Sequence, residues 1–377
     1  MPEFEKEIAA ASAAFETLLR EQLARQTKMR AGSTVSKKTE KIVIGLIDGD
    51  GIGPIILKAA ERVLSRLLAR EIADERVELR RIEGLTLENR LAQGVSVPSD
   101  VLEAIRACDV LLKGPTTTPK GGTMESANVT LRRELDLYAN VRPVAIAREG
   151  IDWTFFRENT EGEYVLGSRG IEIPGELAMD FKVTTNCGTR RIARAAFEFA
   201  RANGKKRVSI VTKANIMKKT DGMFSKICHE VAEQYPEIET DEWYIDIMAA
   251  NLVNESIRSD FQVFLLPNLY GDIITDEAAQ IQGGVGTAGS ANIGDSCAMF
   301  EAIHGSAPRM IEQGLGEYAN PQSILKAAEM LLRHVGLMQQ ADRLTAAMDA
   351  VEPSHVPTGL SSGARAEDYC RDILAQL

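Results

Sequence analysis

The stretch IVIGLIDGDGIGP, residues 42–54, decides the fold class. Its first six residues, Ile42–Ile47, form a continuous apolar run, which is typical of a strand buried on both faces. A glycine-rich turn follows, and Pro54 stands where a helix would begin, since proline is favoured at the first helical position. The turn is not G-x-G-x-x-G, so a dinucleotide-binding loop and a plain strand-to-helix turn are equally open.

The rest of the body continues this alternation of strands and helices. Strand-like runs occur at 110–112, 153–156, 208–212 and 263–266, and helical patterns lie between them, as at 190–202 and 216–233. Strands that alternate with helices predict an α/β fold with a largely parallel sheet. Residues 163–168 and 179–184 flank a turn that contains Gly and Pro, and they predict a β-hairpin arm.

The first forty residues differ from this body. Apolar residues recur near a 3.6-residue period over residues 3–28, which predicts an amphipathic helix. A polar, basic stretch at 29–41 predicts a linker. A lone helix of this length is only marginally stable in water, so we expect it to pack on the main body or on a partner subunit.

Composition excludes several classes of protein. The 377 residues are 44% hydrophobic and 26% charged, as in a folded soluble protein large enough for two domains. The net charge of −10 argues against nucleic acid and anionic membrane surfaces as partners. No apolar run approaches the ~20 residues that span a bilayer, and the N-terminus does not resemble a signal or transit peptide. The five cysteines form no C-x-x-C pair, which favours reduced thiols and a cytoplasmic location.

Acidic residues suggest a cation site. Asp272 and Asp276 stand four residues apart, so on a helix their carboxylates share one face. Carboxylates in such a pair repel each other unless a cation lies between them, and Mg²⁺ and Mn²⁺ favour oxygen ligands. Asp246 stands alone within an apolar run, which makes it a candidate third ligand. A solvated acidic face remains the alternative for the helix pair.

Arginines suggest an anionic substrate. Arg132, Arg142 and Arg157 each follow an apolar stretch, where a solvated arginine is less expected. Guanidinium groups bind carboxylates through paired hydrogen bonds, so three of them suit a substrate with several carboxylates. Each arginine could instead pair with a local acidic side chain.

Taken in order, seven motifs resemble one known family. They are GDGIGP at 49–54, KGPTTTP at 113–119, RRELDLYANVRP at 132–143, RENTE at 157–161, KANIMK at 213–218, NLYGDIITD at 268–276 and FEAIHGSAP at 300–308. The chain resembles the metal-dependent, decarboxylating β-hydroxyacid dehydrogenases, which act on isocitrate, isopropylmalate, homoisocitrate or tartrate. The resemblance covers residues 41 to about 336.

This resemblance implies an architecture and an assembly. The expected fold is the isocitrate/isopropylmalate dehydrogenase-like α/β fold, in which 41–137 and 283–377 form a large domain and 138–282 an inserted smaller α/β domain. Residues 1–40 precede both as a helical extension and linker. The hairpin near 163–184 is the expected arm through which two subunits of a homodimer clasp. Active sites in this family lie between domains and are shared, so Lys213 and Asp246 are expected to serve the other subunit's site.

The resemblance also implies a role for each candidate residue. The Mg²⁺ or Mn²⁺ ligands are Asp246, Asp272 and Asp276, Lys213 is the base and Tyr164 is the acid. The substrate ligands are Ser126, Asn128, Arg132, Arg142 and Arg157. Ser126 and Asn128 match the isocitrate arrangement, so the substrate expected is this tricarboxylate, oxidised and decarboxylated to 2-oxoglutarate and CO₂. Homoisocitrate, isopropylmalate and tartrate are the alternatives.

The cofactor is NAD or NADP, and the sequence leaves the choice open. The expected cofactor-binding residues are Thr118, Asn215, His304, Gly305, Ala307, Arg309 and Asn320. An arginine favours the 2′-phosphate of NADP, but Arg309 followed by Met310 matches neither familiar pattern. A non-catalytic regulatory subunit is a remote alternative, because such subunits lose part of the catalytic set and this chain keeps it.

Overall fold

The computed structural model describes residues 4–31, 41–119, 124–167, 169–284 and 288–377. The chain packs as two units: unit 1 comprises Met1–Val35 and Phe156–Ile273, and unit 2 comprises Ser36–Phe155 and Ile274–Leu377. The predicted linker at 29–41 falls largely outside the described residues. The unit limits lie within strand β5 (Ile151–Glu158) and helix α10 (Asn268–Gln282), which each run from one unit into the other. The domain limits expected from the sequence, near 137 and 282, remain a prediction.

Unit 2 contains most of the strands. They are β1 (Ile42–Ile47), β2 (Val77–Arg81), β3 (Val110–Lys113), β4 (Ala139–Ile146), β11 (Gly289–Ile293) and β12 (Ala298–Ala302), in the order β2-β1-β3-β12-β11-β4. β1 runs parallel to β2 and β3, and β12 runs parallel to β3. β11 is antiparallel to both β12 and β4, so the sheet is mixed. The predicted α/β class and the predicted strand at 42–47 are confirmed.

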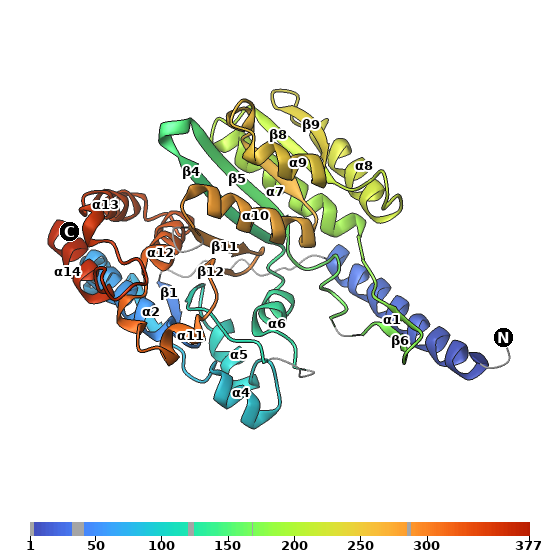
Figure 1. The fold of residues 1–377 in the computed structure, drawn as a ribbon, viewed down its shortest axis with the longest axis horizontal. Coiled ribbons are helices and arrows are strands. Elements are labelled where there is room, and N and C mark those ends of the chain that lie inside the picture. Colours follow the sequence, from blue (N-terminus) through green and yellow to red (C-terminus); the bar gives the residue numbers. More distant parts are fainter. Residues whose placement is uncertain (1–3, 32–40, 120–123, 168, 285–287) are drawn as a thin grey trace. The chain divides into compact units, whose positions relative to one another are not determined.

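Helices cover the sheet of unit 2 (Figure 1). They are α2 (Gly53–Leu67), α3 (Ala69–Ala73), α4 (Leu87–Gln93), α5 (Ser99–Arg106), α6 (Ala127–Glu134), α11 (Pro308–Glu312), α12 (Gln322–His334), α13 (Met338–Asp349) and α14 (Ala366–Gln376). Pro54 lies in the first turn of α2, as the sequence indicates. Ile105 of α5 and Leu131 of α6 are fully buried in one core cluster with Ile47 of β1. This packing fixes α6, which carries three of the predicted substrate ligands.

Unit 1 contains a parallel strand group with its own helices. Its elements are α1 (Glu5–Ala31), β6 (Ile171–Ile173), β7 (Leu177–Met179), α7 (Asn186–Ala202), β8 (Arg207–Thr212), α8 (Thr220–Ala232), β9 (Glu239–Tyr244), α9 (Ile245–Val253) and β10 (Val263–Leu266). β8 runs parallel to both β9 and β10. α7 and α8 pack on each other and on these strands. Thr185 caps α7 by accepting a hydrogen bond from the N–H of Gly188.

An antiparallel hairpin lies within the predicted range of 163–184, but its strands are shorter than predicted, and Gly162 and Val183 form an isolated antiparallel bridge at its base. The antiparallel pair is β6 with β7, at 171–173 and 177–179, inside the stretch expected to be a turn. Residues 163–167 form turns instead, and Ser168 lies outside the described residues. Val165 and Leu166 are buried against Leu18 of α1. Among the described helices, none is long and apolar enough to cross a bilayer.

Candidate active site

The glycine-rich turn between β1 and α2 is closed by its surroundings. The Asp50 carboxylate accepts hydrogen bonds from two backbone N–H groups, at 2.7 and 2.8 Å. The N–H of Ile52 donates to the carbonyl oxygen of Ser306 at 3.0 Å, and the N–H of Gly53 donates to that of Asp50 at 2.9 Å. Gly51 has a φ of +60°, and a Cβ there would lie 1.9 Å from the Ser306 oxygen. The turn is therefore a tight junction rather than an open phosphate-binding loop.

The loop after β12 holds a buried acceptor. Nδ1 of His304 lies 3.0 Å from the carbonyl oxygen of Gly305, which assigns the ring proton to Nδ1. Burial lowers the pKa of His304, so the ring is neutral and Nε2 is an acceptor. Nε2 is buried and has no hydrogen-bond partner among the described residues. Since an unsatisfied buried acceptor is costly, this atom fits a ligand that offers an N–H or O–H group, such as an adenine amine or a ribose hydroxyl.

The other predicted cofactor residues differ in exposure and in their hydrogen bonds. Arg309 lies exposed on α11, and its side chain makes no hydrogen bond or ion pair with the part of the chain that is described. Ala307, just before α11, has a φ of +46°. Asn320 is engaged locally, since its Oδ1 accepts from the N–H of Gln322 at 2.9 Å. Thr118 in unit 2, Gly305 in the His304 loop and Asn215 in unit 1 are exposed. An exposed cation and a buried acceptor on one loop fit a nucleotide.

Arg132 of α6 is held by a buried charge network. Its Nη2 lies 3.2 Å from Oε1 of Glu301, and Nζ of Lys113 lies 3.1 Å from Oε2 of the same carboxylate. Asn292 also donates to Oε1 at 2.8 Å. Burial acts most strongly on Glu301 and raises its pKa, but the charges of Lys113 and Arg132 outweigh burial and lower that pKa to about 2. Glu301 is therefore ionised, and it fixes the guanidinium of Arg132.

Two polar side chains accompany Arg132 on α6. Asn128 stands one turn before Arg132, so both side chains share a face of the helix. Its Oδ1 accepts from the hydroxyl of Thr116 at 3.1 Å, which leaves its amide N–H groups to donate elsewhere. Ser126 is the N-cap residue, but its hydroxyl makes no capping hydrogen bond. The start of α6 therefore offers an amide, a hydroxyl and a guanidinium together.

Two of the predicted arginines pair with the two predicted cation ligands of α10. Nη1 of Arg142 lies 3.2 Å from Oδ1 of Asp276 within unit 2, and it also donates to Thr275. Within unit 1, Arg157 pairs with Oδ1 of Asp272 and donates to Oδ1 of Asn268 at 3.0 Å. The local pairing left open by the sequence is thus observed. Both acids keep an exposed fraction, 39% for the Asp272 side chain and 63% for that of Asp276.

Tyr164 joins the Asp272 group. Its hydroxyl donates to Oδ2 of Asp272 at 2.7 Å, and the guanidinium of Arg157 lies 5.4 Å from the centre of its ring. Gly271 makes this approach possible, since a Cβ there would lie 2.6 Å from Cγ of Arg157. The structure thus brings a predicted acid, a predicted substrate ligand and a predicted cation ligand into direct contact.

Lys213 and Asp246 form a second predicted pair in unit 1. Nζ of Lys213 lies 2.6 Å from Oδ1 of Asp246, and this hydrogen bond is the main cause of the lowered pKa of Asp246. Asp221 holds the backbone of Lys213, because its Oδ2 accepts a hydrogen bond from the N–H of Lys213 at 2.8 Å. Asp221 is fully buried and is neutralised by Lys182 at 2.6 Å. The base predicted from the sequence is therefore anchored through its backbone.

The carboxylates of α10 fit a divalent cation by their chemistry. Two oxygen donors lie one turn apart on a helix and remain partly exposed, as Mg²⁺ and Mn²⁺ require. Over the described residues, no group of three His, Cys, Asp or Glu side chains could hold a metal ion. One chain thus supplies the α10 pair without Asp246. This pattern fits the expectation that Asp246 completes the site of a second subunit, which stays a prediction.

Sequence reasoning missed the residues that hold these groups in place. Lys113 ends the apolar strand VLLK and Glu301 lies within the apolar strand AMFEA. A charge inside a buried strand needs a partner of opposite sign, so these two interruptions could have predicted the pair. Asn268 and Asp221 gave no comparable signal, because amides and acids near helix starts usually act as caps.

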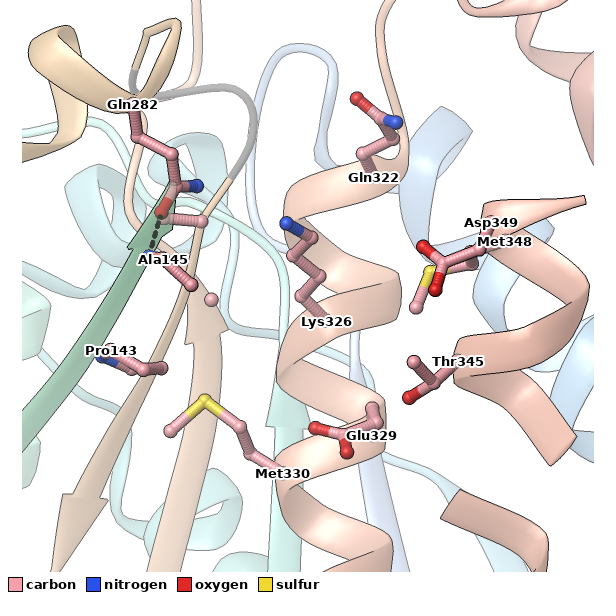
Figure 2. Close-up of a pocket in the computed structure, with 12 residues that line it drawn as sticks. Pro143, Ala145, Gln282, Gln322, Lys326, Glu329, Met330, Thr345, Met348 and Asp349 are labelled. Carbon is pink, nitrogen blue, oxygen red and sulfur yellow. Dashed lines mark hydrogen bonds between the residues drawn. The ribbon is translucent and has the colours of Figure 1, made fainter. Parts of the chain in front are cut away.

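A separate pocket of about 320 Å³ lies in unit 2 (Figure 2). None of the predicted site residues lines it. Its walls carry Lys326 of α12, Gln282, Gln322 and Asp349. Asp349 and Glu329 both act electrostatically on Lys326, so the pocket has no dominant charge and indicates no single class of ligand.

Comparisons with known proteins agree with these features. Residues 43–371 match the sequence model of the isocitrate/isopropylmalate dehydrogenase family. A probable isocitrate dehydrogenase (NAD) subunit alpha, mitochondrial, of Caenorhabditis elegans is 38% identical over 346 residues, 89% of this chain and 92% of that one. An isocitrate dehydrogenase (NADP) of Rickettsia bellii is 42% identical over 299 residues, 76% of this chain and 58% of that one. The crystal structure of isocitrate dehydrogenase from Methylococcus capsulatus has a TM-score of 0.79 at 36% identity and covers 89% of this chain and 99% of its own.

Proposed function

Because this chain belongs to the isocitrate/isopropylmalate dehydrogenase family, we propose that it converts isocitrate to 2-oxoglutarate and CO₂. The reaction uses NAD or NADP and Mg²⁺ or Mn²⁺. The observation that carries the choice of substrate is α6 with its N-cap residue, where Ser126, Asn128 and Arg132 offer polar groups. An isopropyl group would leave these groups without partners, whereas a third carboxylate would bind them.

Three arginines match three carboxylates. Arg132 is already fixed by Glu301, while Arg142 and Arg157 are paired with the acids of α10. A divalent cation held by these acids would weaken their attraction for the two arginines, whose guanidinium groups could then bind the substrate. Substrate and cation binding are therefore expected to support each other.

The cation ligands are Asp272 and Asp276 of one subunit with Asp246 of the partner subunit. A bound divalent cation supplies positive charge beside the C2 oxygen, which favours loss of the hydroxyl proton and later stabilises the enolate. Lys213 accepts the hydroxyl proton of C2. Nζ of Lys213 lies 2.6 Å from Oδ1 of Asp246, so the proposed base contacts a proposed cation ligand. A cation beside Lys213 would favour loss of the ammonium proton, which would leave the neutral amine as the base.

Tyr164 completes the reaction after decarboxylation. The bond between C3 and its carboxylate breaks and CO₂ leaves, the electron pair of that bond moves into the enolate, and C3 must then gain a proton. The hydroxyl of Tyr164 already donates at 2.7 Å to Asp272, so its proton points to the proposed cation site. Tyr164 therefore donates the proton to C3.

The His304 loop is the proposed nucleotide site. NAD or NADP supplies the acceptor for the hydride that leaves C2. The buried Nε2 of His304 offers an acceptor, and Arg309 on α11 offers a cation for a phosphate. Thr118, Asn215, Gly305, Ala307 and Asn320 keep the roles that the family resemblance implies.

A homodimer with shared sites follows from the same proposal. Tyr244, Ile247 and Val253 are exposed around Asp246, with exposed fractions of 42%, 46% and 55%. Ile273, next to Asp272, is also exposed. Apolar side chains beside the proposed acidic ligands support an interface there, since large exposed apolar patches often mark protein–protein contacts.

All five cysteines are free thiols, which supports the proposal of a reducing, cytoplasmic location.

The start of α6 provides the test. Asn128→Leu should raise the KM for isocitrate by about ten- to a hundredfold, because a charge-assisted hydrogen bond to the third carboxylate is lost. Val129→Leu, at the next position, is the matched control and should leave KM unchanged. An unchanged KM in Asn128→Leu would contradict this assignment.

A further inference from the structure

Helix α1 lies outside the residues that match the family, yet it contacts the segment that carries Tyr164 (Figure 1). We propose that α1 positions Tyr164 for proton transfer by holding residues 160–169 through Arg25 and Leu18. Arg25 and Leu18 are positioning residues and do not touch the reacting atoms. The inference rests on the proposed function, in which Tyr164 is the acid.

The polar anchor lies before Tyr164. Nη1 of Arg25 lies 3.3 Å from Oε1 of Glu161, and its Nη2 donates to the hydroxyl of Thr160 at 3.2 Å. Glu161 is only 2% exposed, and its Oε2 accepts from the N–H of Thr185 at 2.8 Å. Arg25 therefore reaches from α1 to a carboxylate in the interior of unit 1.

The guanidinium of Arg25 stabilises the ionised form of the buried Glu161. Burial and the nearby Glu158 raise the pKa of Glu161 to about 7, and Arg25 opposes both effects. Without Arg25 the buried carboxylate would keep its like-charged neighbour and lose its counter-charge. Glu161 would then take up a proton or move, and either change alters its hydrogen bonds to Glu158 and Thr185. Tyr164 follows three residues later.

The apolar anchor lies directly after Tyr164. Leu18, the one buried side chain among those described in α1, packs on Val165 and Leu166. The ring of Phe15 lies 5.4 Å from that of Phe181, which belongs to the same cluster. One turn further on, Glu21 pairs with Arg169 at 2.6 Å. α1 therefore contacts the chain on both sides of Tyr164.

Leu18 is the one buried side chain among the described residues of α1, so substitutions at the main contacts of this helix are expected to weaken its docking. Ile8, Phe15, Leu19 and Leu23 of α1 are each about half exposed, between 46% and 58%. Docking thus depends on Leu18 and Arg25 more than on a broad apolar face. Arg20 and Leu23 provide matched controls, because Arg20 pairs with Glu16 of the same helix and with no other described residue, and Leu23 is exposed.

The test compares Arg25→Met and Leu18→Ala with Arg20→Met and Leu23→Ala in the full chain. Amide hydrogen exchange of a peptide covering 160–169 should speed up in the first two variants and stay at the wild-type rate in the controls. The kcat for isocitrate should fall about tenfold with KM nearly unchanged, since acid catalysis contributes about 10²- to 10⁴-fold. Exchange of the C3 hydrogens of 2-oxoglutarate with D₂O should slow by the same factor, because that step needs Tyr164. Arg25→Lys should restore part of kcat and part of the C3 exchange rate.

Two results would overturn the proposal. One is an unchanged kcat and C3 exchange in variants whose 160–169 peptide exchanges faster. The other is an unchanged peptide exchange in both variants. If Arg25→Met or Leu18→Ala misfolds, the other variant still provides the test, because Arg25 contacts residues before Tyr164 and Leu18 contacts residues after it. A wild-type chain that does not turn over isocitrate would instead contradict the proposed function, while the peptide exchange would still report whether α1 restrains the segment.

Discussion

The hydroxyl of Tyr164 donates a 2.7 Å hydrogen bond to Asp272, so within unit 1 the proposed acid is in direct contact with a proposed cation ligand. The same carboxylate also accepts from Arg157. A change at Asp272 must therefore affect proton transfer, substrate binding and cation binding together.

Asp272→Asn should raise the Mn²⁺ concentration needed for half-maximal activity by about ten- to a hundredfold, because a charged ligand is lost. Glu277→Gln, on the same helix, is the control and should leave the Mn²⁺ titration unchanged. The measurement is initial rate against free Mn²⁺. A titration of Asp272→Asn that overlays the wild type would remove Asp272 from the cation site.

The buried Glu301 predicts a pH-dependent stability. Its pKa in the folded chain is about 2, below the ordinary value of 4.5, so the folded state binds fewer protons between these values. The stability that ionised Glu301 contributes is present above about pH 4.5 and is lost as pH falls towards 2. Urea unfolding of the wild type should therefore show a midpoint that drops over this range.

Glu301→Gln should flatten that pH dependence. It leaves Lys113 and Arg132 buried without their shared counter-charge, so the free energy of unfolding at pH 7 should fall by about 3–5 kcal/mol. Glu134→Gln removes the acid of an exposed pair with Arg106 and should cost at most about 1 kcal/mol. Equal losses in the two variants would show that the network contributes little.

Strong local patterns in the sequence predict central strands of the ten-stranded sheet and miss the strands at its two ends. The continuous apolar run at 42–47 predicts β1, whereas VELRR and ETDEWY at β2 and β9 are polar because they lie at the ends of the strand order. β11, with the sequence GSANI, is missed because its residues are small. A Cβ on Gly289 would lie 2.5 Å from the N atom of Ala327 of α12, so close helix packing selects glycine there.

The site shows the same division. Spacing along one helix predicts that Asp272 and Asp276 share a face, because helix geometry alone determines it. Their arginine partners come from β4 and β5 and depend on tertiary packing, which the spacing does not encode. The limits of the hairpin strands were wrong for a similar reason, since Val165 and Leu166 pack on Leu18 of α1, a contact distant in sequence.

A mixed-subunit experiment tests the shared site. If Lys213 serves the partner's substrate, mixing inactive Lys213→Ala chains with inactive Arg132→Ala chains should restore about a quarter of the wild-type rate, since half of the dimers are mixed and each has one intact site. Subunit exchange should be shown separately by mass. Exchange without recovered turnover would mean that each site is built within one chain.

Arg309 tests cofactor choice. Arg309→Ala should weaken the binding of NADP by about ten- to a hundredfold, because charge-assisted hydrogen bonds to the 2′-phosphate are lost. The binding of NAD should change little. Arg309→Asp should turn the preference towards NAD, since it repels the phosphate and offers the ribose an acceptor. The measurement is kcat/KM for both cofactors. Equal losses for NAD and NADP would refute the phosphate contact.

The most direct test of the account is a substrate panel on the wild-type chain. Isocitrate, homoisocitrate, isopropylmalate and tartrate are each assayed with NAD and with NADP, with Mn²⁺ or after exhaustive chelation, by following reduced cofactor and released CO₂. The account predicts turnover of isocitrate that yields both products and stops on chelation. Robust turnover of isopropylmalate without isocitrate, or isocitrate oxidation that survives chelation, would contradict it.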